Sequence, residues 1–466
     1  MTSLDITFPA STSIELDDKT MTVPRRHFLS ASAGAALAGL GWPLISSAAP
    51  QPAGLKSGQP YRGVNISVLV PSAAQFRAQE KRLPAFEALT GIKVQYRYVP
   101  FRNLLDKITI ASVSNTVDYD VVTYLDAWGP SLSPYLAPLD GLMGAAGADL
   151  SPYPSAFQQA VRYDNVTYGL PVRGLGQLLF YRKDLFRQMG IQPPETWQQL
   201  IAMAPQIHRS FDISPIAMNY GQGNGAQNLF DWLNVLWSKG GDVVGPDGRV
   251  RFNDAIGVDS TTFYIDLLKR YGVAAPGSVQ FDEGDKVNSM AQGNSAMVMI
   301  WFWAYPVLVG KRSRLTSAQV GFVPVPRIAD GRNSSIAVAM PFSITRMSAK
   351  KAAAAEFLKW VSSPELEVAI STDKTNPTNS DVVVTHTSSF SDAAVNNANG
   401  GLQREGIKSL GSARTLPQLH AWPHVAAILE ATMSTLVTTN QPVKPALDMA
   451  AAQIDRLLRR SGDQHS

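Results

Sequence analysis

The stretch YGLPVRGLGQLLFYRKDLFRQMGIQPPETWQQL, residues 168–200, decides the fold class of this chain. Residues 178–181 form a short apolar and aromatic run of the kind that a buried strand needs. Residues 183–189 continue at helical spacing, and Gly190 stands where a helix would end in a left-handed cap. The two prolines that follow forbid continuation of that helix, and Thr196 can cap the next one. The stretch therefore predicts strand, helix, stop and second helix, which is the repeating unit of an α/β protein.

The composition indicates a large globular protein. With 466 residues the chain is too long for one ordinary core and suits two large lobes. Its net charge is only +4, and the basic residues are scattered without a basic stripe that carries aromatics, so we expect no nucleic-acid partner. Cysteine is absent, which excludes disulfides, thiolate metal sites, cysteine nucleophiles and lipid attachment at a lipoprotein cysteine.

The first fifty residues have the pattern of an export signal. The pair Arg25-Arg26 precedes an apolar stretch over residues 31–45 and a run of small residues, which resembles a twin-arginine signal with its cleavage site. About 15 apolar residues fall short of the roughly 20 that a membrane-spanning helix needs, so cleavage is favoured over anchoring. Met21 lies closer to the arginine pair than Met1 does. We therefore predict that residues 1–49 are a signal peptide with an upstream extension and that the mature protein is periplasmic.

Apolar runs and amphipathic segments alternate along the mature chain. Strands are expected over residues 64–70, 92–99, 120–124 and 296–300, and helices over 76–89, 101–113, 350–361 and 445–460. Pro84 predicts a kink or a break in the first of these helices, and Ser363 is expected to cap a further one. The polar residues 371–399 are expected to form a loop. Such alternation implies a mostly parallel sheet, whose ligands bind beyond the carboxyl ends of the strands, here at residues 125–129.

Several of these segments resemble a known family. The motifs "YGLPV…YRKDLF…G…PPETW", "FEALTGIKV", "YDVV" and "GNSAMVMIWFWAYP" are similar to segments of the extracytoplasmic solute-binding proteins that serve sugar-importing ABC transporters. The resemblance implies an α/β, two-lobed periplasmic-binding-protein fold of type II-like organisation, with discontinuous domains and a hinge of three chain crossings. The implied lobes are residues 60–171 with 326–371, and residues 172–325 with 372–466.

Sugar recognition needs flat aromatic faces, which pack against pyranose rings, and planar polar side chains, which bridge hydroxyls. The candidates that the residues and the resemblance supply are Asp126, Trp128, Arg173, Asn219, Tyr220, Trp301, Trp303 and Trp422. Strand alternation places Trp301 and Trp303 on one face, with core packing as the alternative for each tryptophan. Arg173 is the cationic candidate. Its planar fork would suit a carboxylate, phosphate or sulfonate, whereas a surface arginine is the simpler interpretation.

Motifs for catalysis and for metal binding are missing from the sequence. Neither His-Glu-x-x-His nor Gly-x-Ser-x-Gly occurs. Asp282 and Glu283 are neighbouring carboxyl groups, but a solvated loop is the expected setting for them. We therefore expect no metal, no cofactor and no enzymatic activity.

These inferences together predict a monomeric substrate-binding protein of an ABC importer. It would capture a sugar or polyol between its lobes and deliver that ligand to the membrane permease. One alternative is an anionic sugar, such as a uronate, a sugar phosphate or a sulfonated sugar, held by Arg173. The other is a secreted carbohydrate-active enzyme.

Overall fold

The computed structural model describes residues 54–463 except 115–116, 145–146, 224, 374 and 376–381. All of the described residues belong to one compact unit. The predicted export signal, residues 1–49, lies outside the described residues. Within the described part of the chain, no helix combines the length and the apolarity that crossing a bilayer requires.

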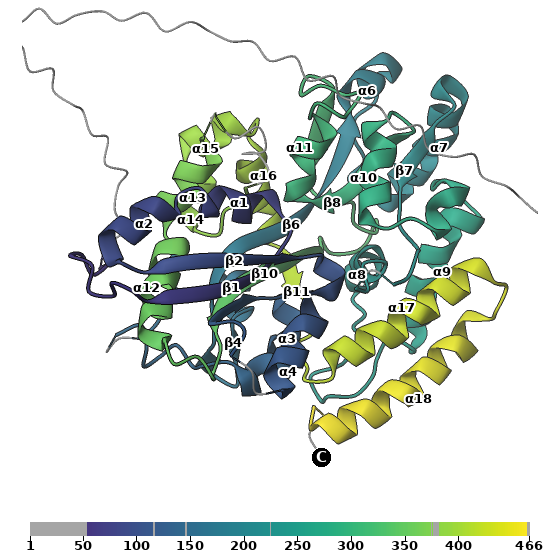
Figure 1. Ribbon diagram of the computed structural model, residues 1–466. Coiled ribbons are helices and arrows are strands. Elements are labelled where there is room, and N and C mark those ends of the chain that lie inside the picture. Colours follow the sequence, from purple (N-terminus) through teal and green to yellow (C-terminus); the bar gives the residue numbers. More distant parts are fainter. Residues whose placement is uncertain are drawn as a thin grey trace, which may run out of the picture. The chain divides into compact units, whose positions relative to one another are not determined.

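The main sheet runs through the whole compact unit (Figure 1). Its strand order is β2-β1-β3-β10-β6-β8-β7, with β9 beside β6 and β11 beside β10. The bounds of its strands are β1 (Asn65–Pro71), β2 (Lys93–Val99), β3 (Val121–Thr123), β6 (Leu170–Arg182), β7 (Ser214–Ala217), β8 (Ser295–Trp301), β9 (Val320–Val323), β10 (Ser335–Ile344) and β11 (Ala413–Thr415). A small separate sheet pairs β4 (Arg162–Tyr163) with β5 (Val166–Thr167).

The main sheet is mixed, so the expectation of a mostly parallel sheet was wrong. β1 pairs in parallel with β2 and β3, as β7 does with β8 and β11 with β10. β6 and β10 run antiparallel to each other. β6 is also antiparallel to β8 and β9, and β10 is also antiparallel to β3. These two long strands connect the halves of the molecule directly and need no helical crossover. Their direction therefore could not be inferred from the alternation of strands and helices.

Strand β6 is shared by two lobes, which confirms the predicted two-lobed fold. Residues 170–176 of β6 pair with β10 in the first lobe, which also holds β1, β2 and β3. Residues 177–182 pair with β8 and β9 in the second lobe, which also holds β7. The change of partner falls between Gly176 and Gln177.

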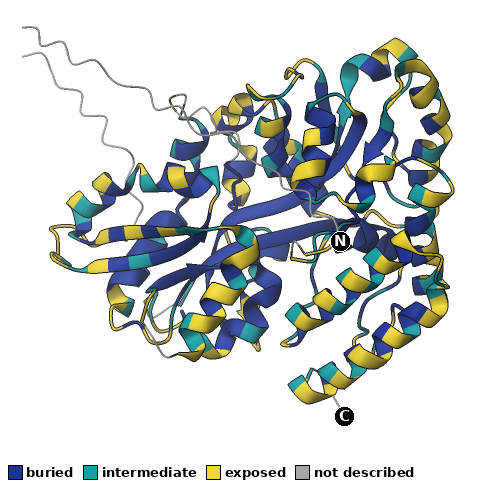
Figure 2. Ribbon diagram, turned by 45° about the vertical axis from the view of Figure 1, so that its right-hand side comes forward, coloured by how far each residue is buried: buried dark blue, intermediate teal, exposed yellow. Residues whose placement is uncertain are grey.

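Helices cover the sheet, and Figure 2 shows buried strands among helices that expose their outer faces. The α-helices are α1 (Ala74–Glu80), α2 (Leu83–Thr90), α3 (Leu104–Val113), α4 (Gly129–Leu132), α5 (Ser155–Gln159), α6 (Lys183–Met189), α7 (Trp197–Phe211), α8 (Leu229–Ser238), α9 (Ala255–Lys269), α10 (Glu283–Ala291), α11 (Tyr305–Leu308), α12 (Lys351–Val361), α13 (Pro364–Ser371), α14 (Thr387–Ser391), α15 (Ala393–Ala398), α16 (Leu402–Leu410), α17 (Trp422–Thr438) and α18 (Val443–Ser461). Short 3-10 turns are η1 (Phe101–Asn103), η2 (Asp126–Trp128), η3 (Ser133–Tyr135), η4 (Pro276–Val279) and η5 (Phe302–Ala304).

The local signals of the opening stretch are confirmed. Helix α6 ends at Gly190, which has a left-handed φ of 67°. Thr196 caps α7, because its Oγ1 accepts a hydrogen bond of 3.2 Å from the backbone N–H of Gln199. The strand that precedes α6 has 13 residues, far more than the four that the apolar run indicated. Its first half is ordered by pairing with β10, a partner more than 150 residues away in the chain.

Two further expectations can be compared with the structure. The break at Pro84 is confirmed, since α1 and α2 are separate helices and Pro84 lies in the first turn of α2. The loop expected over residues 371–399 was wrong in its second half, which holds α14 and α15. The polar residues there cap helices, because Asp392 Oδ1 accepts a hydrogen bond of 2.9 Å from the backbone N–H of Val395.

Candidate functional site

A cavity of about 480 Å³ lies between the two lobes, beside the point where β6 passes from one to the other. This volume is within the range of small-molecule sites. Both lobes contribute to its wall, and β1 and β3 end there, so the cavity has the predicted place at the carboxyl ends of strands. The residues that line it are Pro71, Ser72, Ala73, Ala74, Phe101, Leu125, Arg173, Leu175, Val338 and Met340 from the first lobe and the shared strand, and Gln227, Phe230, Glu283, Trp301, Trp303, Pro306 and Val307 from the second lobe.

The second lobe gives the cavity an aromatic wall. Phe230 and Trp301 meet edge to face, with ring centroids 5.0 Å apart and an interplanar angle of 79°. Trp301 is the last residue of β8, and Trp303 follows in η5. Both tryptophans line the cavity, as expected, but Trp303 reaches it through a helical turn and not through strand alternation.

The residue between the two tryptophans fixes this turn. A Cβ atom placed on Gly176 would lie 2.5 Å from the ring of Phe302, and one on Gly406 would lie 2.7 Å from it. Only glycine leaves room for the ring at these two positions, one on the hinge strand β6 and one on α16. The Phe302 ring therefore packs between Gly176 and Gly406. This packing positions the neighbouring residues Trp301 and Trp303 at the cavity wall.

A buried carboxyl group lies beside this aromatic wall. Trp301 Nε1 donates a hydrogen bond of 2.7 Å to Glu283 Oε1, and Glu283 is 6% exposed. Burial raises the pKa of Glu283 to about 7, although nearby Lys286 and the bond from Trp301 both lower it. The expectation of a solvated loop was wrong for this residue. Asp282 caps α10, since its Oδ1 accepts a hydrogen bond of 2.9 Å from the backbone N–H of Asp285, and Glu283 therefore begins a helix whose inner face is buried.

An ion pair is buried next to Glu283. Lys286 Nζ donates to Asp231 Oδ1 at 3.1 Å and to Oδ2 at 3.2 Å, and the two side chains are 0% and 1% exposed. Burial raises the pKa of Asp231, and Lys286 opposes that shift, as does the backbone N–H of Asn219. Sequence reasoning missed this group. The available signal was the spacing of Glu283 and Lys286, three residues apart on one helix face.

Arg173 also lines the cavity and is 5% exposed, so the interpretation as a surface arginine was wrong. Its Nη1 donates a hydrogen bond of 2.9 Å to Gln75 Oε1 in α1. Gln75 Nε2 in turn donates to the carbonyl oxygens of Val172 and Val383, at 2.7 and 3.2 Å. This network ties the guanidinium to the first lobe.

Asp126 lies next to the cavity but outside its wall. It is fully buried, and its Oδ1 accepts from the backbone N–H of Ala127 at 2.8 Å while Oδ2 accepts from that of Ala339 at 3.2 Å. Burial raises the pKa of Asp126 to about 7, and these two backbone bonds oppose the shift. The carboxyl group therefore holds the loop after β3 against β10, and Leu125 reaches the cavity instead.

Trp128 borders a side chamber of about 130 Å³ that also touches α17. Its ring stacks on that of Phe101, with centroids 5.4 Å apart and an angle of 28°. Phe101 lines both spaces, so it forms the partition between the chamber and the main cavity.

The remaining candidates lie in the core of the second lobe. Tyr220 is 1% exposed, and its hydroxyl donates to Met218 Sδ at 3.3 Å. Trp422 is 2% exposed and begins α17, and Asn219 is fully buried. The structure thus brings Arg173, Trp301 and Trp303 together, and it places the other candidates around the cavity or away from it.

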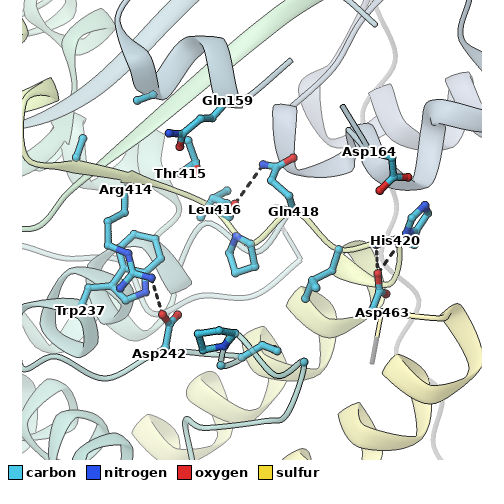
Figure 3. A pocket seen from close by; sticks show the side chains of 18 of the residues that line it. Gln159, Asp164, Trp237, Asp242, Arg414, Thr415, Leu416, Gln418, His420 and Asp463 are labelled. Atoms are coloured by element: carbon cyan, nitrogen blue, oxygen red, sulfur yellow. Dashed lines mark hydrogen bonds and ion pairs between the residues drawn. The ribbon is translucent and has the colours of Figure 1, made fainter. Parts of the chain in front are cut away.

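A larger cavity of about 600 Å³ lies elsewhere, between α5, α8, β11 and the end of α18 (Figure 3). Several of its charged groups already have partners within the protein. Arg414 lies over the Trp237 ring, 4.6 Å from its centroid, and Nη2 donates a hydrogen bond of 2.5 Å to Asp242 Oδ2. Asp463 accepts a hydrogen bond of 2.8 Å from the backbone N–H of His420. The interlobe cavity is the stronger candidate for ligand binding, because residues of both lobes line it and it has an aromatic wall. Among the described residues, no cluster of side chains has the composition of a metal site.

Comparison with known proteins shows the family to which the chain belongs. The family model of the bacterial extracellular solute-binding proteins matches residues 71–367, more than half of the chain. The chain belongs to this family. A probable amino-acid ABC transporter periplasmic-binding protein of Sinorhizobium fredii is 26% identical over 316 residues, which cover 66% of this chain and 70% of that protein. The mannitol-binding protein of Pseudomonas aeruginosa is 26% identical over 235 residues, covering 49% and 52%. The maltose-bound structure of MalE3 from T. maritima superposes with a TM-score of 0.76 at 20% identity, covers 85% of this chain and 100% of that one, and shows the same fold.

Proposed function

We propose that this protein is the substrate-binding component of an ABC importer and that it captures a sugar or polyol between its lobes for delivery to a membrane permease. The observation that carries the proposal is the interlobe cavity with Trp301, Trp303 and Phe230 on one wall. Aromatic faces of this kind pack against the C–H faces of sugar rings. A relative with the name of a mannitol-binding protein and the family membership support the same conclusion.

Capture would work through closure of the lobes. A ligand shifts a conformational equilibrium only if it binds one state better than the other. Phe101 and Arg173 approach the cavity from the first lobe and the shared strand, and Trp303 from the second. A ligand that touches all three is bound more tightly when the lobes close, which supplies the required difference.

An anionic ligand is the second candidate, and Arg173 favours it. Glu283 in the same cavity opposes it, since a carboxylate near a ligand anion lowers affinity. The cavity therefore supports a ligand without net negative charge. An enzymatic function has less support, because glycosidases use two carboxyl groups flanking the scissile bond. Glu283 is the one carboxyl among the described residues of the cavity wall.

We also propose the lobe boundaries given above, a monomeric state, and export to the periplasm by the twin-arginine route with cleavage near Ala49. The switch of β6 between Gly176 and Gln177 lies close to the first proposed crossing at residue 171. Replacing Arg25 and Arg26 by Lys should retain the precursor in the cytoplasm, and mass spectrometry of the periplasmic fraction would test the cleavage.

The test of the main proposal is a thermal-shift screen with neutral sugars, polyols, uronates and sugar phosphates. A ligand at 100 times its dissociation constant should stabilise the protein by roughly 2.7 kcal/mol. Small-angle scattering with that ligand should show a smaller radius of gyration, as expected for hinge closure. Conversion of the ligand to product during incubation would overturn the proposal in favour of an enzyme.

A further inference from the structure

Glu283 presents one free carboxyl oxygen to the cavity. Its Oε1 is occupied by the indole N–H of Trp301 at 2.7 Å. Within the described part of the chain, no side chain or backbone group donates a hydrogen bond to Oε2. Because the residue lines the cavity, Oε2 is the atom that a ligand would reach.

The charges around this oxygen leave a deficit of positive charge. Lys286 gives its two hydrogen bonds to Asp231, and that buried pair has no net charge when both groups are ionised. When Glu283 is ionised, it therefore adds one negative charge that the pair does not balance. Asp231 and Asp282 act against its ionisation, and Lys286 attracts it from within a pair that is already formed. Arg173 lines the same cavity from β6, where its Nη1 donates to Gln75 Oε1 in the first lobe.

The wall next to Glu283 suits a cation on a ring-shaped ligand. Trp301 and Trp303 line the cavity with Phe230. The face of an indole ring attracts a positive charge as well as the C–H groups of a sugar ring. A hydroxyl group could also bond to Oε2, but only an ammonium group would bring a countercharge for the ionised carboxylate.

We infer that Glu283 is a specificity-determining residue of the cleft and that it selects a sugar or cyclitol bearing a protonated amine, bound through an ammonium–carboxylate pair at Oε2. This inference rests on the proposed function, since it names the ligand class of the same cavity. It predicts that an amine at one ring position increases affinity where a hydroxyl or an acetamido group does not.

The experiment is titration calorimetry at pH 7 with matched ligands. The probes are glucosamine, glucose and N-acetylglucosamine, the corresponding galactose and mannose series, and 1-amino-1-deoxysorbitol with sorbitol. In at least one series the amine should bind about tenfold more tightly, or better, than its hydroxyl counterpart. Glu283→Gln, which has the same shape without the charge, should remove that preference. The quantity compared is the ratio of amine to hydroxyl affinity within each protein, so a general effect of Glu283→Gln on the cavity wall, which the neutral members report, cancels from it. Glu195→Gln, at an exposed site, is the control and should keep the preference.

The other outcomes are decisive as well. If neutral members bind and the amines bind no better, the inference is overturned while the proposed function stands. A preference that persists in Glu283→Gln overturns the role of this residue. If no member of any series binds, both the inference and the sugar-binding proposal fail. The preference of the unmodified protein tests the inference even if a variant does not fold.

Discussion

Trp301 and Glu283 are joined by a hydrogen bond of 2.7 Å between the indole Nε1 and the carboxyl Oε1, and both side chains are buried at the wall of the interlobe cavity. They come from different elements, β8 and α10. The bond fixes an aromatic ring and a carboxyl group relative to each other before any ligand arrives. A surface that is already ordered loses less conformational entropy when it binds.

Replacing Trp303 by Ala should weaken ligand binding by at least about a hundredfold, since loss of a central aromatic contact typically costs several kcal/mol. The free energy of unfolding should fall by less than the binding free energy does, because the Trp303 side chain is only partly buried and lines a cavity. Titration calorimetry measures the affinity and urea unfolding the stability. Phe211→Ala, at a partly buried aromatic of α7, is the control and should leave affinity unchanged. Parental affinity in Trp303→Ala would show that the tryptophan is not a ligand contact.

Replacing Arg173 by Ala should change affinity for a neutral ligand by less than about fivefold. For an anionic ligand the same change removes the countercharge in a buried site and should cost roughly 2–5 kcal/mol. Loss of the bond to Gln75 should also lower the free energy of unfolding by about 1 kcal/mol, whichever class of ligand the protein binds. Arg187→Ala, at an exposed position of α6, is the control. Calorimetry distinguishes the ligand classes, and abolished binding would favour the anionic alternative.

Stability should fall as the pH rises from 5 to 8, in part because of Glu283. Burial raises the pKa of Glu283 from 4.5 to about 7, so the folded protein holds a proton that the unfolded chain has lost. The stability that this proton provides is complete below pH 4.5 and is lost as the pH rises through 7. Without ligand, the loss between pH 5 and 8 is of the order of 2–3 kcal/mol. In Glu283→Gln the loss of stability between pH 5 and 8 should be smaller by this amount. A part of the pH dependence should remain, because the pKa of Asp126 is also raised to about 7. Urea unfolding at each pH measures the slope, and equal slopes in both proteins would contradict the assignment.

Replacing Lys286 by Met should destabilise the protein by roughly 3–5 kcal/mol, because Asp231 would keep a buried charge without its partner. The double variant Lys286→Met with Asp231→Leu should recover most of that loss, since two apolar side chains need no compensation. Chemical denaturation of both variants measures the difference. If the double variant is no more stable than the single one, the cost lies in packing and not in charge.

The parts of the fold that the sequence predicted depend on local geometry. Gly190 and Thr196 act within their own helix ends, and the break at Pro84 needs only the missing N–H of proline. The long hinge strand could not be predicted in the same way. Its first half is a strand because β10 lies beside it, and the sequence around residue 170 has no signal for a partner that distant.

Of the predicted ligand residues, Arg173, Trp301 and Trp303 lie in the wall of the interlobe cavity. Trp303 was a candidate through the family resemblance, and Arg173 was a candidate although a surface arginine was the simpler interpretation; the structure places both in the cavity wall. Asp126 has the right chemistry, but its oxygens are occupied by backbone N–H groups. Glu283 was missed because its burial depends on how α10 packs against β8, which no neighbouring residue in the sequence specifies.

Strand β6 belongs to both lobes, and neither lobe is therefore a separable piece of the chain. Cutting the molecule at the hinge would leave one fragment without the strand that completes its sheet, and the new edge would expose unpaired N–H and C=O groups. Because the sheet of each lobe depends on this strand, we expect the two lobes to fold and to unfold together. An inherited duplication or a designed exchange of one lobe would have to carry a full copy of β6 with it.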